Sequence, residues 1–182
     1  MSDIQIAKVY EKRYKEFSFP IAKDKNGNLI DNHGHNRPYV IFFSHNKVFY
    51  LSAKTILNNN RKSTSADKTN VIFKKDLYGK DREIAVNCSV INIMDRELFE
   101  SLYIKDNILN NFQTDIEHYN IIMKELFDVF DEIKYFEVDY IENGKVSWKK
   151  KMKVWRIKKN VKWWLKDIIG FYKMKKYLLK WF

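Results

Sequence analysis

The sequence predicts an α+β fold, in which a compact antiparallel sheet carries added helices and a basic C-terminal helix. Three observations support this prediction. Alternating apolar residues with short turns indicate antiparallel hairpins. Apolar residues at every third or fourth position indicate helices later in the chain, and no glycine-rich nucleotide loop follows a strand. A chain of 182 residues with 45% hydrophobic residues is large enough to form one hydrophobic core.

The N-terminal half predicts mainly strands. Residues 3–9 alternate between apolar and polar and indicate a short strand, whereas Tyr10 to Phe17 indicates a short helix. Residues 38–52 form two β-rich runs around His45-Asn46, which is the pattern of a hairpin with a two-residue turn. Two polar loops are predicted, at residues 23–36 and 57–70.

The second half begins with β-rich residues at 71–75 and 83–94. Asp95 can cap a helix that begins RELFESLY. Residues 106–133 carry apolar side chains at helical spacing and predict a long helix.

The spacing of apolar residues changes twice after residue 133. Residues 134–156 alternate on both sides of Asn143-Gly144 and predict a second hairpin. From about Ile157 to Phe182 the spacing is helical again, with lysines largely off the apolar face. Its longest uncharged run is far shorter than the roughly 20 residues needed to span a bilayer.

Charge divides the chain into two parts. The net charge is +11, but residues 1–144 hold 20 basic and 22 acidic residues, while residues 145–182 hold 14 basic residues and one acid, Asp167. All five tryptophans lie in that second part. We therefore expect an α+β domain over 1–144 and a basic, Trp-rich strand and amphipathic helix over 145–182. Such a segment attracts polyanions, and three interpretations stay open: RNA binding, contact with a membrane surface, or packing on the body.

Three short motifs suggest phosphoryl chemistry. Ser52 and Lys54 are two residues apart at the end of a predicted strand, so their side chains point the same way. A hydroxyl can bond a phosphate oxygen, and an ammonium group can stabilise charge in a transition state. Arg37 can bind phosphate through two parallel hydrogen bonds, and Tyr10 can orient a hydroxyl or stack on a base. Each alone is also compatible with an ordinary surface or core residue.

Metal and disulfide sites are not expected. Cys88 is the single cysteine, which excludes an intramolecular disulfide and favours a reducing cytoplasm. Asp31, His33 and His35 share one loop, but no third metal ligand with suitable spacing is evident. His33 and His35 remain candidates for general acid–base work. No cofactor is predicted.

The motifs occur in an order that resembles the ToxN/AbiQ family, the endoribonuclease toxins of type III toxin–antitoxin systems. Residues 6–17 are similar to the opening strand and Tyr-bearing helix of that family. NRPYVIFFSHNKVFYLSAK, residues 36–54, resembles its two-strand core, which ends in a Ser-x-Lys motif. INIMDRELF and the helix predicted over 106–133 fit more loosely, and the segment after about Ser147 has no counterpart.

The resemblance implies a MazF-like β-barrel with added helices and a role as a cytoplasmic toxin in phage defence. It implies metal-independent cleavage of RNA to 2′,3′-cyclic phosphate and 5′-hydroxyl ends. The implied active-site residues are Tyr10, Arg37, Ser52 and Lys54. The implied partners are substrate mRNA and a small repeat-derived RNA antitoxin, held with the toxin in a closed protein–RNA oligomer; no DNA partner is expected.

Residues with basic or aromatic side chains are expected to contact nucleic acid. The predicted contacts are Arg37, Tyr39, Lys62, Lys149, Lys150, Lys151, Trp155 and Arg156. The alternative function is a non-catalytic RNA-binding or membrane-surface protein that acts through residues 145–182.

Overall fold

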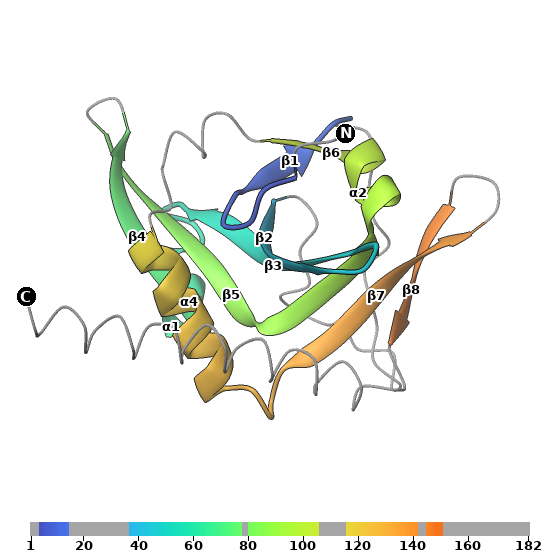
Figure 1. Cartoon of the computed structure of the whole chain (residues 1–182). Helices are drawn as coiled ribbons and strands as arrows, with labels where there is room; N and C mark the ends of the chain where they lie inside the picture. The colour runs from blue at the N-terminus through green and yellow to red at the C-terminus, as the bar shows by residue number, and fades with distance from the viewer. Residues whose placement is uncertain (1–3, 15–36, 78–79, 106–115, 142–144, 151–182) are drawn as a thin grey trace, which may run out of the picture.

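The structure is a computed structural model that describes residues 4–14, 37–77, 80–105, 116–141 and 145–150 (Figure 1). Within these ranges the fold is mixed α+β, as predicted, and rich in strands. Several predictions lie outside the described residues. These are the loop over 23–36, the first ten residues of the helix predicted over 106–133, the Asn143-Gly144 turn and the segment 151–182.

The strands and helices follow the chain in a simple order. The strands are β1 (Tyr10–Lys12), β2 (Pro38–Ser44), β3 (Lys47–Ile56), β4 (Asn70–Leu77), β5 (Lys80–Asp95), β6 (Tyr103–Lys105), β7 (Lys134–Ile141) and β8 (Lys145–Lys150). The helices are α1 (Arg61–Ala66), α2 (Arg96–Leu102) and α4 (Ile116–Asp128). The hairpin around His45-Asn46 is confirmed, and His45 takes the left-handed conformation with φ 55° that such a turn uses. The helix after Asp95 is confirmed too, because the Asp95 carboxylate accepts a hydrogen bond from the Glu97 N–H at 3.0 Å.

The larger sheet is organised around β5. Its order is β2-β3-β5-β7-β8, and β4 also pairs with β5. β3 follows one edge of β5, whereas β4 and β7 pair with the first and second halves of β5 on the other edge (Figure 1). β7 runs parallel to β5, which differs from the antiparallel expectation; α2, β6 and α4 lie between them in the chain, and a parallel pair needs such a long connection. The pairings among the described strands do not close the sheet into a barrel.

A large irregularity bends β5 near its middle. Against β3, Ser52 pairs with Asn87 and Tyr50 pairs with Asn92, so two positions along β3 correspond to five along β5. The Asn87 side-chain oxygen accepts hydrogen bonds from the Ser89 N–H at 3.0 Å and from the Ser89 hydroxyl at 2.6 Å. These local bonds stabilise the bulge because they satisfy backbone polar groups that the ladder leaves unpaired.

Three expectations for the described residues are wrong. Tyr10–Lys12 is a strand rather than the start of a helix, because it pairs with β6. Before it, residues 4–9 form only an isolated bridge between Val9 and Tyr39. The loop predicted over 57–70 contains α1. For Tyr10–Lys12, pairing with residues distant in sequence overrides the local pattern.

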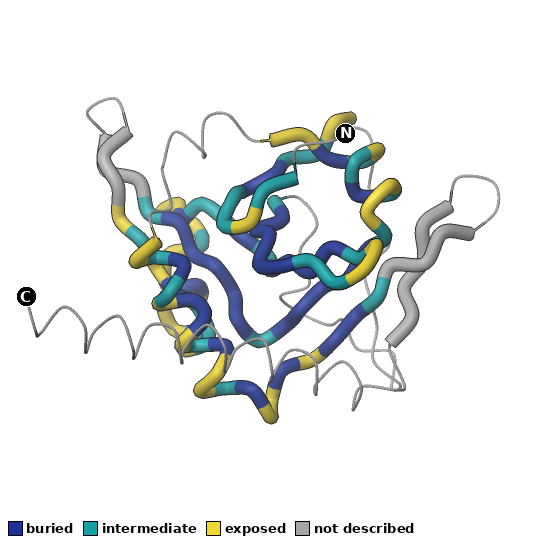
Figure 2. The backbone as a smooth tube through the Cα atoms, in the orientation of Figure 1, coloured by how far each residue is buried: buried dark blue, intermediate teal, exposed yellow. Residues whose placement is uncertain are grey.

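Two hydrophobic clusters lie on opposite faces of the sheet. One contains α4 residues such as Ile122 and Leu126, together with Leu51 and Ala53 of β3. The other contains Phe99 of α2, packed with Tyr50 of β3 and with residues of β1 and β6. Consecutive residues along much of β3 and β5 are therefore buried (Figure 2).

Glu83 on β5 connects α1 to the sheet. Its carboxylate pairs with Arg61 at the start of α1 and with Lys74 of β4, whose Nζ lies 3.4 Å from Oε1. Burial alone would raise the pKa of Glu83, but the hydrogen bonds from Arg61 and Lys74 outweigh it, so the pKa is lowered from its ordinary value of 4.5.

A carboxyl group whose pKa is lowered by folding stabilises the protein above its ordinary pKa and loses that contribution as the pH falls. We therefore expect Glu83→Gln to lower the free energy of unfolding at pH 7, and the difference from wild type to shrink as the pH falls toward 3. Urea unfolding at several pH values measures this. Glu132→Gln, at an exposed carboxylate, is the control; a Glu83→Gln difference that does not change with pH would contradict the assignment.

Candidate functional site

Ser52 and Lys54 lie on the same face of β3, as the sequence predicted. Leu51 and Ala53 belong to the cluster beneath α4, so the residues that alternate with them face the other way. Tyr50, two residues before Ser52, belongs to the cluster with Phe99 on that other face. The register between β2 and β3 is regular from Pro38 to Val40, which preserves this alternation through Ser52.

The two polar side chains are accessible to a ligand. Ser52 and Lys54 are both half-buried, and no hydrogen bond or ion pair joins either side chain to another described residue. Lys54 lies beside Ala85 of β5, and Ala85 lies beside Ile72 of β4. On its β5 side the ammonium group therefore has small and apolar neighbours, and no described carboxylate neutralises its charge.

Asn87 forms a fixed polar group beside Ser52. It is 3% exposed, and it pairs with Ser52 on one side and with Asn70 on the other. Its side-chain nitrogen donates to Asn70 Oδ1 at 2.8 Å, to Asp67 Oδ2 at 3.0 Å and to Thr69 Oγ1 at 3.1 Å. The bulge of β5 thus lies directly opposite Ser52, and bulges often occur beside functional sites, where they redirect side chains.

Tyr10 reaches the same neighbourhood from β1. Val9 pairs with Tyr39, so Tyr10 lies beside Pro38, and Pro38 pairs with Ser52. Its ring packs edge-on against Phe99, with centroids 5.3 Å apart, and its hydroxyl accepts a hydrogen bond from the Gln5 N–H at 2.8 Å. The side chain is only 4% exposed, so Tyr10 forms part of the wall of this region.

The backbone of Arg37 lies close to Ser52 and Lys54. Its carbonyl oxygen accepts a hydrogen bond from the Ala53 N–H at 2.9 Å, between Ser52 and Lys54. Arg37 precedes β2, which begins at Pro38, so strand alternation does not fix the direction of its side chain. The convergence of its guanidinium group with Ser52 and Lys54 therefore stays a prediction.

The predicted nucleic-acid contacts have different outcomes. Tyr39 is 0% exposed, so its ring is not available to stack on a base, and we remove it from the expected interface. Lys62 is exposed on α1 and stays a prediction. The side chains of Lys149 and Lys150, and the whole of Lys151, Trp155 and Arg156, lie outside the part of the chain that is described.

The described residues hold neither a cluster of metal ligands nor a membrane-spanning helix. Over the described ranges, no three His, Cys, Asp or Glu side chains are grouped as metal ligands; the loop with Asp31, His33 and His35 lies outside those ranges. Over the same ranges, no helix is both long enough and apolar enough to cross a membrane.

The arrangement can bind one phosphate group. The Ser52 hydroxyl can donate to a phosphate oxygen, and the Lys54 ammonium can bind a second oxygen. The sequence reasoning missed Asn87, although a signal was present: asparagine is depleted in strands, and Asn87 interrupts the apolar run of β5. No protein-family model, no curated protein and no solved structure matches this chain.

Proposed function

We propose that this protein is a metal-independent endoribonuclease that binds the scissile phosphate of RNA between Ser52 and Lys54. The observation that supports it most is the placement of these two polar groups, which no other described side chain pairs, on one face of β3, opposite the bulge of β5. The 14 basic residues against one acid in residues 145–182 favour a polyanionic partner, although residues 1–144, which contain β3, are nearly neutral. The resemblance to the ToxN/AbiQ family suggests the same motif and adds a toxin role in the cytoplasm, with an RNA antitoxin as inhibitor. The closed barrel of that family is not needed for this chemistry, which depends on one face of β3.

The proposed reaction is an internal transesterification. The ribose 2′-oxygen attacks the adjacent phosphorus, the bond from phosphorus to the 5′-oxygen breaks, and a 2′,3′-cyclic phosphate forms. The 2′-hydroxyl loses a proton, and the leaving 5′-oxygen gains one. Lys54 stabilises the charge on the non-bridging oxygens, Ser52 donates a hydrogen bond, and the ordered wall that includes Tyr10 helps to hold the chain in line. Lys54, Tyr10 and His33 are the candidates for proton transfer.

The test is the identity of the RNA ends. Purified full-length protein, incubated with single-stranded RNA in excess EDTA, is expected to produce 5′-hydroxyl ends that polynucleotide kinase labels without prior phosphatase treatment. A matched RNA with a single 2′-deoxy substitution at the cleaved nucleotide should resist cleavage there, because the nucleophile is missing. Ends with 5′-phosphate, or cleavage of the 2′-deoxy substrate, would contradict the mechanism.

The alternative is binding without cleavage, through the basic and aromatic residues 145–182. Deletion of residues 151–182, which keeps β8 paired with β7, separates the two functions. An enzyme centred on β3 should retain some cleavage in the shortened protein, whereas a binding module of this kind should lose its RNA or membrane affinity.

A further inference from the structure

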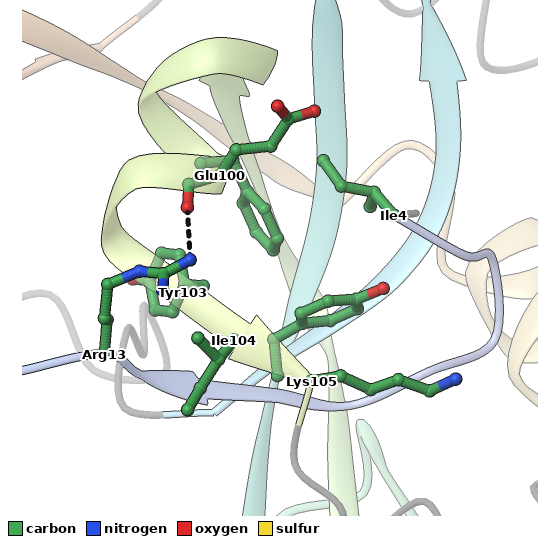
Figure 3. A pocket seen from close by; sticks show the side chains of 8 residues that line it. Ile4, Arg13, Glu100, Tyr103, Ile104 and Lys105 are labelled. Carbon is green, nitrogen blue, oxygen red and sulfur yellow. Dashed lines mark hydrogen bonds between the residues drawn. The ribbon is translucent and has the colours of Figure 1, made fainter. Parts of the chain in front are cut away.

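A pocket of about 250 Å³ lies beside the small sheet of β1 and β6 (Figure 3). Its apolar lining comes from Ile4 and Ile104, with the buried rings of Tyr10, Phe99 and Tyr103 beneath. Ile104 is 38% exposed, so apolar surface is in contact with solvent here. The volume is below the roughly 300–1,000 Å³ typical of sites for drug-sized ligands, which suits a small planar group.

Two cations border this pocket, and both are held by neutral oxygen atoms. Arg13 Nη2 donates to the Glu100 carbonyl oxygen at 3.1 Å, and Lys105 Nζ donates to Gln5 Oε1 at 2.8 Å. Figure 3 shows these two side chains on opposite sides of the pocket. Neither cation pairs with a carboxylate among the described residues. Each cation is therefore held by a hydrogen bond to a neutral oxygen, and no described carboxylate neutralises its charge.

One carboxylate also lines the pocket, but it is already engaged. Glu100 Oε1 lies 3.0 Å from Arg96 Nε, a neighbour one turn away on α2. This ion pair reduces the repulsion that an incoming anion would meet. The remaining charge at the rim, from Arg13 and Lys105, is positive.

We propose that this pocket binds one nucleotide of a single-stranded RNA, with the base between Ile4 and Ile104 and the phosphate against Arg13 and Lys105. An apolar slot bordered by fixed cations matches a flat base joined to an anion. Tyr10 lines the pocket and also lies beside Pro38, the partner of Ser52. The inference rests on the proposed function, since it makes this pocket the subsite for a nucleotide near the cleaved bond.

The test measures binding without requiring cleavage. Full-length Lys54→Ala protein is titrated with AMP, GMP, CMP and UMP, and the methyl NMR signals of Ile4 and Ile104 are followed. At least one nucleotide is expected to shift both signals. Adding Arg13→Ala or Lys105→Ala should weaken that binding about tenfold, the effect of losing one charge-assisted hydrogen bond. Lys124→Ala, on the far side of the sheet, should leave it unchanged.

Two further probes test whether the pocket binds a phosphate group alone or a membrane surface instead of a nucleotide. Inorganic phosphate alone should bind more weakly than the nucleotide and should not shift the Ile4 methyl signal, since it lacks a base. Vesicles of phosphatidylglycerol should not shift these signals either. The inference is wrong if none of the four nucleotides shifts both signals, if neither rim variant weakens binding, or if only the vesicles bind. Nucleotide binding without any RNA cleavage by the wild type would instead refute the proposed function and leave this pocket assigned.

Discussion

Lys54→Ala is expected to lower the rate of RNA cleavage about 100- to 1,000-fold, and Ser52→Ala to lower it by a similar or smaller factor. Removal of a single group that stabilises transition-state charge has effects of about this size. Both side chains are half-buried and make no hydrogen bond to another described residue, so each variant should fold normally. Single-turnover cleavage of one RNA measures the rate, and circular dichroism with urea unfolding checks the fold.

Two matched variants sharpen this test. Lys54→Arg keeps the positive charge but replaces a compact ammonium group with a planar guanidinium, so it should recover only part of the activity. Lys124→Ala removes an exposed lysine from α4, which packs on the opposite face of the sheet, and should cleave like the wild type. Because Ser52 and Lys54 act on one phosphate in the proposal, the double variant should lose less than the product of the two single effects. Wild-type cleavage by both single variants would refute the site.

Local sequence patterns predicted the elements that depend on neighbouring residues. The hairpin of β2 and β3 follows from alternation on both sides of His45-Asn46, and α2 follows from the capping position of Asp95. The shared face of Ser52 and Lys54 follows from the two-residue period of a strand. These predictions need no knowledge of the rest of the chain.

Other parts of the fold depend on contacts that the local pattern does not contain. The sequence of Tyr10–Lys12 is compatible with a helix, and only pairing with β6, some 90 residues later, makes it a strand. The bulge of β5 requires both β3 and the hydrogen bonds of Asn87. Arg37 lies just before β2, outside the alternation of a strand. Consequently, the shared face of Ser52 and Lys54 could be predicted from the local sequence, whereas the direction of the Arg37 side chain could not.

Phe99→Ala is expected to cause the largest loss of stability, about 3–5 kcal/mol. The Phe99 side chain is 0% exposed, and its ring contacts those of Tyr10, Tyr50 and Tyr103 at centroid distances of 5.3, 5.6 and 4.8 Å. Its removal leaves a cavity among side chains of three different strands, β1, β3 and β6. Since native domains are stable by only about 5–15 kcal/mol, this variant would lose a large share of the total. Urea unfolding measures the change, and Phe99→Leu, which keeps most of the apolar volume, should lose much less.

We expect each core substitution to destabilise mainly the elements that belong to its own hydrophobic cluster. Phe99 belongs to the cluster with β1 and β6, whereas Leu126 of α4 belongs to the cluster on the opposite face. Hydrogen exchange of Phe99→Ala should therefore speed up first in β1, β6 and α2, while Leu126→Ala should affect α4 and the strands beneath it. Tyr10 lies in the Phe99 cluster and beside Pro38. Phe99→Ala should therefore also reduce RNA cleavage, even in the absence of denaturant, when the large sheet remains folded. Full activity combined with rapid exchange in β1 would show that the ordered wall around Tyr10 is not needed to position the RNA, and would confine the chemistry to β3.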